Sequence, residues 1–251
     1  MLGIKKVLKS VLLPRITNYV FSVSRRERLG RHEFFYNAFK ALSFNGINGD
    51  YAEFGCCGGN TFHLAYHEAL RHGHNAKLWA FDSFQGLPAA AEEKDSHPAW
   101  VEGHMVTSLD RFHQICASNR IPRDAYNVVP GFYDATLTTK SHSEAPANLA
   151  LVYIDCDLYS STKTVFAFLK PRMKHGMIIA FDDYYCWSAT QISGERMAML
   201  EFFSENPVWT LSPYMQFGWH GQSFVVESRK LVDPGFQMPA QSPGPAIGSL
   251  N

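Results

Sequence analysis

The sequence lacks an excess of charge of either sign. Lys and Arg together number 23, Asp and Glu also number 23, and the formal net charge at pH 7 is therefore zero. A protein that coats DNA or RNA holds it through a positive field that releases counterions from the phosphates. The charge balance argues against that class, and we expect no nucleic acid among the partners.

Long apolar runs and paired cysteines are missing as well. No stretch of about 18 uncharged apolar residues occurs, which predicts that no segment spans a membrane. The five cysteines form no C-x-x-C pair and their number is odd, so neither a zinc ribbon nor a disulfide framework is indicated. We expect reduced thiols in a cytoplasmic protein. The cysteines are Cys56, Cys57, Cys116, Cys156 and Cys186.

The amino terminus carries several basic side chains before its first acidic one, Glu27. Lys9 and Arg15 interrupt any apolar core of a signal peptide, and no small-residue cleavage site follows. A basic amphipathic helix can lie on an anionic membrane. The alternative that we favour is a helix that packs on the domain or on a second subunit. We also expect a homo-oligomer.

Short apolar segments alternate with helix-length segments from about residue 48 onward, the pattern of an α/β fold. Five mostly parallel strands are expected at 50–55, 77–82, 126–131, 149–155 and 176–182, followed by two antiparallel ones at 207–215 and 221–227. One helix is expected at 61–73, ending at Gly73, and another at 161–170, capped by Ser160 or Ser161. We divide the chain into a helical cap (1–47), an α/β domain (48–232) and a disordered, Pro/Gly/Ser-rich tail (233–251).

The connection from Gly86 to Met105 is long for a loop inside an α/β unit. It follows the second expected strand, whose carboxyl end faces the ligand crevice of such folds. We therefore expect it to be a lid or a binding element. His97 and His104 in this loop are candidates for contact with a substrate.

A glycine-rich turn, Glu53-Phe-Gly55-Cys-Cys-Gly-Gly59-Asn-Thr61, joins the first strand to a helix. Glycine lets a backbone approach a ligand closely, but such a turn can equally be structural. Asp82 ends the second strand 23 residues after Gly59, the position at which nucleotide-binding folds carry the carboxylate that binds a ribose. The glycine-rich turn and Asp82 together favour an adenosine-type ligand with a free 2′-hydroxyl. No Walker lysine follows, which argues against a P-loop enzyme.

Four aspartates follow the fourth and fifth strands: Asp155, Asp157, Asp182 and Asp183. Neighbouring parallel strands end at one edge of a sheet, so these carboxylates should crowd one volume, with Asp155 and Asp157 on the same side if the backbone stays extended. Like charges at that range raise pKa values or require a cation, and oxygen ligands favour Mg²⁺. The alternative is that single aspartates cap helices or bind ribose.

Several of these segments occur in the order of one known family: EFGCCGGNT, FDSFQGLP, W-x-x-G-x-M, GFYDATL, YIDCDLYSST and FDDYY. Over residues 48–200 the chain resembles the macrocin O-methyltransferase (TylF-type) family of class I S-adenosylmethionine-dependent methyltransferases. The resemblance implies a Rossmann-like, mostly parallel seven-stranded sheet with helices on both faces. It also implies S-adenosylmethionine and Mg²⁺ as cofactors and a sugar hydroxyl, on a small molecule or an oligosaccharide, as acceptor.

The same resemblance assigns roles to individual residues. It implies that Gly55, Gly59 and Thr61 line the methionine part of the cofactor and that Glu53 shapes their loop. Asp82 would hold the ribose. The remaining cofactor contacts would be Ser83 and Phe84 beside the ribose, Gly131 and Phe132 beside the adenine, and Asp155. Asp155, Asp182 and Asp183 match the metal ligands, and Asp157 matches the general base.

Two features bear on the alternatives. The Cys56-Cys57 pair stands where relatives usually carry other residues. His63 and His67 lack the glutamate of an H-E-x-x-H zinc site, so we interpret them as ordinary helix residues.

The competing functions are a nucleotide-sugar or NAD-dependent oxidoreductase that uses the same adenosine pocket, and a binding module without activity. Unused buried carboxylates are costly, which argues against the module.

Overall fold

The computed structural model describes residues 23–137 and 145–237. Within them, seven strands form one sheet in the order β3-β2-β1-β4-β5-β7-β6. The strands are β1 (Asp50–Phe54), β2 (Leu78–Asp82), β3 (Tyr126–Pro130), β4 (Leu149–Ile154), β5 (Ile178–Phe181), β6 (Trp209–Phe217) and β7 (Gly221–Ser228). The helices are α3 (Val23–Phe44), α4 (Asn60–Arg71), α5 (Leu109–Ser118), α6 (Tyr133–Thr136), α7 (Tyr159–Leu169), α8 (Gly194–Glu205) and α9 (Arg229–Val232).

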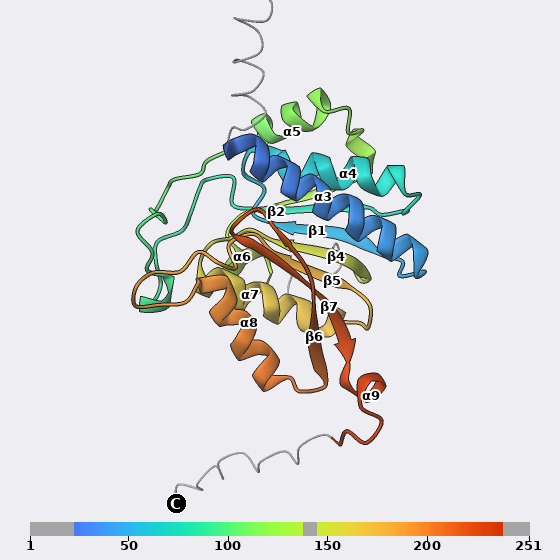
Figure 1. Cartoon of the computed structure of the whole chain (residues 1–251). Helices are drawn as coiled ribbons and strands as arrows, with labels where there is room; N and C mark the ends of the chain where they lie inside the picture. The colour runs from blue at the N-terminus through green and yellow to red at the C-terminus, as the bar shows by residue number, and fades with distance from the viewer. Residues whose placement is uncertain (1–22, 138–144, 238–251) are drawn as a thin grey trace, which may run out of the picture.

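The first five strands pair in parallel, and β7 pairs antiparallel with both β5 and β6. Helices α3, α4 and α5 lie on one face of the sheet, and α7 and α8 lie on the other (Figure 1). Strand β1 serves both faces, because Tyr51 belongs to one core cluster while Ala52 and Phe54 belong to the other. The predicted α/β architecture, a mostly parallel seven-stranded sheet with helices on both faces, is confirmed.

Helix α3 is part of the hydrophobic core. Phe34, Phe35 and Phe39 are fully buried. The Phe35 ring stacks on Tyr153 of β4 at 5.3 Å, and the Phe34 ring stacks on Phe217 at 4.7 Å. The predicted helical amino-terminal region is confirmed for residues 23–44. Residues 1–22, with four of the six basic side chains that precede Glu27, lie outside the described residues.

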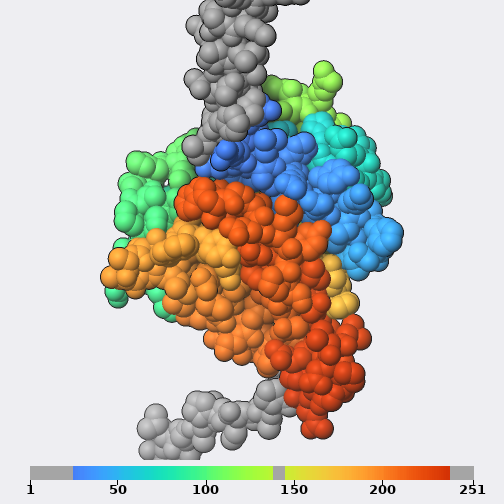
Figure 2. Space-filling view, in the orientation of Figure 1, coloured from blue at the N-terminus to red at the C-terminus, as the bar shows by residue number. Residues whose placement is uncertain are grey.

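The β6–β7 hairpin packs against α3 on the face seen in Figure 2. Contact is close: a Cβ on Gly30 of α3 would come within 2.7 Å of the backbone nitrogen of Gly218, in the turn. The hairpin therefore fixes α3 and His220, the last residue of the turn, beside the end of β5. None of the helices in the described residues is long and apolar enough to cross a membrane.

Two local predictions need correction or limits. Neither Ser160 nor Ser161 caps α7, which begins at Tyr159. The Ser160 N–H instead donates to Oδ1 of Asp95 at 2.8 Å, so a carboxylate from the long loop caps this helix. Of the tail predicted to be disordered, residues 238–251 lie outside the described part, and the domain boundaries stay a prediction.

Candidate functional site

A cavity of about 660 Å³ lies at the carboxyl ends of the parallel strands. Residues that directly follow β1, β2, β4 and β5 line it, as expected for ligand sites in open α/β sheets. Eight of the predicted site residues are among the lining: Gly55, Asp82, Ser83, Phe132, Asp155, Asp157, Asp182 and Asp183. Five others do not line the cavity: Glu53, Gly59, Thr61, Phe84 and Gly131.

Gly55 is required by the approach of two strand ends. Its φ is +92°, and a Cβ at this position would lie 1.7 Å from the backbone oxygen of Asp155. Gly59 has a φ of +60° and faces α5, where a Cβ would come within 3.1 Å of Ile115. The first glycine thus lets β1 and β4 end side by side, and the second opens α4.

Glu53 and Thr61 brace the glycine loop from inside the core. Oε1 of Glu53 accepts a hydrogen bond from the Thr61 hydroxyl at 2.7 Å, and Oε2 accepts one from the Tyr51 hydroxyl. Glu53 has no exposed surface, and burial raises its pKa to about 8. These residues tie β1 to the first turn of α4 and do not line the cavity, and their contact with the cofactor stays a prediction.

Asp82 joins two loops that border the cavity. Its Oδ2 accepts the backbone N–H of Cys56 at 2.6 Å, and its Oδ1 accepts that of Phe84 at 2.6 Å. Phe84 is buried against Phe112 with a φ of +56°, and Gly131 donates its N–H to the Asp82 carbonyl at 2.9 Å. Phe84 and Gly131 therefore shape the pocket around Asp82 without lining it. Burial raises the pKa of Asp82 against the effect of its two N–H donors.

The four aspartates that follow β4 and β5 all line the cavity, as the sequence predicts. The expected extended backbone is wrong at Asp157, whose φ is +63°. Burial, with the charge of neighbouring carboxylates second, raises the pKa values of Asp155, Asp157 and Asp183.

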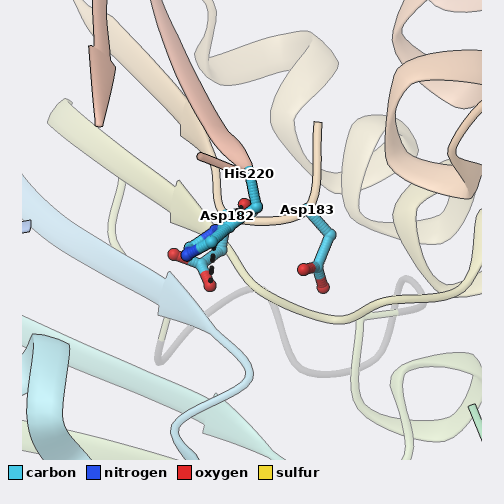
Figure 3. A group of neighbouring side chains, drawn as sticks. All are labelled: Asp182, Asp183 and His220. Atoms are coloured by element: carbon cyan, nitrogen blue, oxygen red, sulfur yellow. Dashed lines mark hydrogen bonds and ion pairs between the residues drawn. The ribbon is translucent and has the colours of Figure 1, made fainter. Parts of the chain in front are cut away.

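Asp182, Asp183 and His220 bring their potential ligand atoms within 4.8 Å of one another (Figure 3). Asp155 is not a member of this group of three. Nδ1 of His220 donates to the backbone carbonyl of Asp182 at 2.6 Å, because a carbonyl oxygen only accepts. That nitrogen is therefore unavailable as a ligand, which leaves Nε2 of His220 and the carboxylates as possible ligands of a metal ion.

Sequence reasoning missed Arg31 of α3. Its Nε donates to Oδ1 of Asp182 at 2.9 Å, and its Nη2 donates to Oδ2 at 2.5 Å, so the pair is bidentate. The Tyr153 hydroxyl donates to the same Oδ1. Although burial lowers the pKa of Arg31, hydrogen bonding and the charge of Asp182 raise it overall. Arg31 lies 151 positions from Asp182 in the sequence, and no local sequence pattern predicts such a contact.

Glu195 in the first turn of α8 was also missed. Its Oε1 accepts the backbone N–H groups of Cys156 and Asp157 at 3.2 and 3.3 Å, and its Oε2 accepts that of Asp183 at 3.0 Å. The side chain has no exposed surface, and burial raises its pKa. Glu195 thus holds together the two loops that carry the aspartates. The only sequence signal is Ser193 just before it, whose hydroxyl caps α8.

The long loop covers one side of the cavity. Leu87, Pro88, Ala89, Ala91, Trp100 and Met105 line it. The ends of the loop are tied together, because Leu87 N–H donates to the His104 carbonyl at 3.0 Å and Gly103 N–H donates to the Leu87 carbonyl at 2.9 Å. Its middle is held by Asp95, which also accepts the N–H groups of Ala91 and Glu92. The His97 ring packs on Trp100 at 4.9 Å, and neither His97 nor His104 lines the cavity.

Other histidines and cysteines have ordinary surroundings. His63 and His67 lie in α4 and contact the backbone carbonyls of Gly59 and Asn119 at 3.1 and 2.9 Å. All five cysteines are free, and Cys57 of the glycine loop lines the cavity.

The cavity is strongly acidic, because six aspartates line it. Arg31, which is already paired with Asp182, is the one basic side chain among the described lining residues.

The sequence profile of the macrocin-O-methyltransferase (TylF) family matches residues 20–205. The chain belongs to this family. Its relatives include 8-demethyl-8-(2,3-dimethoxy-alpha-L-rhamnosyl)-tetracenomycin-C 4′-O-methyltransferase of Streptomyces olivaceus, 28% identical over 56% of this chain and 54% of that protein. Mycinamicin III 3″-O-methyltransferase of Micromonospora griseorubida is 28% identical over 43% of each chain. The matched stretch thus spans about half the length of these relatives.

Solved structures carry the same fold. The O-methyltransferase NovP superposes with a TM-score of 0.67 at 20% identity, over 83% of this chain and 89% of that one. The calicheamicin methyltransferase CalS11 gives a TM-score of 0.62 at 18% identity, over 77% of each chain. TomG from Streptomyces achromogenes, solved in complex with S-adenosylmethionine, gives 0.53 at 10% identity, over 82% of this chain and 89% of that one.

Proposed function

We propose that this protein is an S-adenosylmethionine-dependent O-methyltransferase that methylates a sugar hydroxyl, with Mg²⁺ as a second cofactor. Membership of the macrocin-O-methyltransferase family supports the reaction class. The observation that carries the proposal is the acidic cavity at the carboxyl edge of the sheet, beside a glycine loop. A sulfonium cation is attracted by such a cavity, since six aspartates line it and its arginine is already paired.

The residues that line the cavity fit the cofactor. Each oxygen of Asp82 accepts one backbone N–H and keeps a lone pair that can accept from a ribose hydroxyl. Phe132 offers an aromatic ring beside Asp82 for the adenine, and Gly55 leaves its backbone open to the methionine part. S-adenosylmethionine, when bound, supplies the methyl group on a cationic sulfur.

The same charge distribution argues against the oxidoreductase. NAD and nucleotide sugars carry a diphosphate, which proteins hold with basic side chains or with unpaired N–H groups at a helix start. Among the described lining residues, the sole cationic group is bidentate on Asp182. A diphosphate would meet repulsion from the aspartates instead.

The carboxylate donor set fits a hard divalent cation such as Mg²⁺. Burial and the charge of neighbouring carboxylates raise the pKa values of Asp155 and Asp183, so a bound cation would relieve an unfavourable crowding of charge. We propose Asp155, Asp182 and Asp183 as the residues that hold it. When bound, Mg²⁺ stabilises negative charge that develops on the acceptor oxygen.

The chain's own residues supply the proton transfer and the dry environment. Asp157 lines the cavity, and burial raises its pKa, which makes its carboxylate a stronger base for a hydroxyl proton. Glu195 fixes the Asp157 backbone for this task. Leu87, Pro88 and Trp100 of the long loop exclude water while the methyl group moves from sulfur to oxygen.

The acceptor that we propose is a sugar hydroxyl of a glycoside or an oligosaccharide. The relatives from Streptomyces olivaceus and Micromonospora griseorubida are named for methylation of a rhamnosyl compound and of mycinamicin III. We assign the reaction to the cytoplasm, since all five cysteines are free thiols. Assembly as a homo-oligomer stays a prediction.

Calorimetric titration with S-adenosylhomocysteine and with NAD tests the assignment. We expect S-adenosylhomocysteine to bind and NAD to give no heat. Transfer of labelled methyl from S-adenosylmethionine to a panel of rhamnosides and oligosaccharides then identifies the acceptor, and EDTA should stop turnover reversibly. Binding of NAD in preference to S-adenosylhomocysteine would overturn the proposal.

A further inference from the structure

We infer that Arg31 is an internal competitor for the cation site: its guanidinium occupies Asp182 until a divalent cation displaces it. The inference rests on the proposed cation site and adds a residue from α3 that sets the affinity of that site. Its basis is the bidentate contact, with Nε on Oδ1 at 2.9 Å and Nη2 on Oδ2 at 2.5 Å. Both oxygens that Asp182 offers to a metal ion are thereby engaged.

Asp182 is held by donors on several sides. The Tyr153 hydroxyl donates to Oδ1, and Nδ1 of His220 lies 3.6 Å from Oδ2. Tyr153 is fully buried in β4, and His220 is fixed by the Asp182 carbonyl, so neither side chain can move far. Arg31 is different: its side chain is 24% exposed and lines the cavity. The guanidinium is therefore the partner that can leave.

A guanidinium and a divalent cation exclude each other at one carboxylate. Charge-assisted bidentate pairs are among the strong side-chain contacts, so a cation must replace the pair to bind there. A guanidinium that stayed within about 4 Å of the ion would meet strong repulsion in the partly desolvated cavity. Arg31 thus weakens cation binding, and in return it neutralises Asp182 when no ion is bound.

Competition explains why this cluster tolerates its charge. Asp155, Asp157 and Asp183 have raised pKa values, in which burial is the largest cause and neighbouring carboxylates follow. The charge of Asp182 contributes to each of these shifts, and Asp182 carries the one basic partner among the described lining residues. Exchange of Arg31 for a divalent cation keeps Asp182 paired with positive charge both before and after the ion enters.

Binding of Mn²⁺ to the full chain, without S-adenosylmethionine or acceptor, measures this competition directly. The variants are Arg31→Met, which removes the guanidinium, and Arg31→Lys, which keeps a charge but cannot bridge both oxygens. Arg28→Met is the matched control, because Arg28 lies on the exposed side of the same helix. Free Mn²⁺ is followed by electron paramagnetic resonance, and circular dichroism verifies that each variant is folded.

We expect Arg31→Met to bind Mn²⁺ about 10-fold more tightly or better, since a charged hydrogen-bond pair no longer opposes the ion. Arg31→Lys should fall between Arg31→Met and the wild type, and Arg28→Met should match the wild type. Equal or weaker Mn²⁺ binding in both Arg31 variants overturns the inference while the cation site stands. If no protein of the set binds Mn²⁺, the cation site fails with it, and titration with S-adenosylhomocysteine still tests the methyltransferase assignment.

Discussion

Glu195 and Asp183 are joined by a hydrogen bond of 3.0 Å from the Asp183 backbone N–H to Oε2 of the glutamate. Its other oxygen holds the backbone of Asp157, so one buried side chain sets the spacing of two cavity carboxylates. We predict that Glu195→Ala lowers kcat about 10- to 100-fold, as loss of groups that orient metal ligands does elsewhere. Affinity for S-adenosylhomocysteine should stay within a few-fold of the wild type, because Asp82 and Gly55 do not touch Glu195.

Glu195→Gln is the matched variant, since its amide oxygen still accepts from one of the two loops. We expect it to retain more activity than Glu195→Ala. Steady-state kinetics and calorimetry separate the two effects. A fall in cofactor affinity equal to the fall in kcat would mean that Glu195 only stabilises the fold.

Asp157 is the group to which we assign removal of the acceptor proton. Asp157→Asn should lower kcat about 100- to 10,000-fold, the range for loss of a general base, with cofactor affinity retained. Asp134→Asn removes an exposed carboxylate from the same cavity and serves as the control for charge. Equal losses in the two variants would show that Asp157 acts only through the field of the cavity.

Glu53 makes stability depend on pH. Burial raises its pKa from 4.5 to about 8 in the folded protein, whereas an unfolded chain keeps the ordinary value. The folded state therefore holds the extra proton, and its stability is full below pH 4.5 and declines as the pH rises towards 8. The loss of unfolding free energy is on the order of a few kcal/mol, because a tenfold change in a proton-binding constant corresponds to about 1.4 kcal/mol.

Glu53→Gln removes this titration. We expect the variant to lose less stability than the wild type between about pH 5 and pH 9, by denaturant unfolding at each pH. Parallel curves for the two proteins would mean that the Glu53 carboxyl has an ordinary pKa in the folded protein.

Gly55 and Gly73 form a natural pair for testing the contact between strand ends. Both have positive φ values, +92° and +63°, but a Cβ at Gly73 meets nothing within 4 Å. Gly73→Ala should cost about 1 kcal/mol, from backbone strain alone. Gly55→Ala places a methyl group on the Asp155 carbonyl, so we expect far greater destabilisation or loss of folded protein in thermal melts. Similar melting temperatures for the two variants would contradict the close approach of β1 and β4.

Local patterns in the sequence were sufficient for the strands and for the acidic edge of the sheet. The strand limits differ from the predicted ones by one or two residues, because apolar runs bounded by Gly, Asp and Pro define them. Patterns failed where a contact crosses the chain. Arg31 and Glu195 reach the aspartates from helices that carry no motif, and Asp95 replaces the expected serine cap from a loop 65 positions away.

The backbone conformation of single residues could not be predicted from the sequence pattern either. Asp157 turns into the left-handed region at +63°, and the hydrogen bond from its backbone N–H to Glu195 helps to hold it there. Glu53 and Thr61 belong to the motif, yet their side chains are buried and hydrogen-bond to each other beneath the loop. The motif therefore predicts a loop that borders the cavity, but it does not predict which of its side chains line that cavity.

The decisive experiment is a crystal structure of the full chain with S-adenosylhomocysteine and Mn²⁺. We expect adenosine against Asp82 and Phe132, with an anomalous manganese peak among Asp155, Asp182 and Asp183 and with Arg31 moved off Asp182. A ligand bound outside this cavity, or a manganese peak away from these carboxylates, would refute the proposed site.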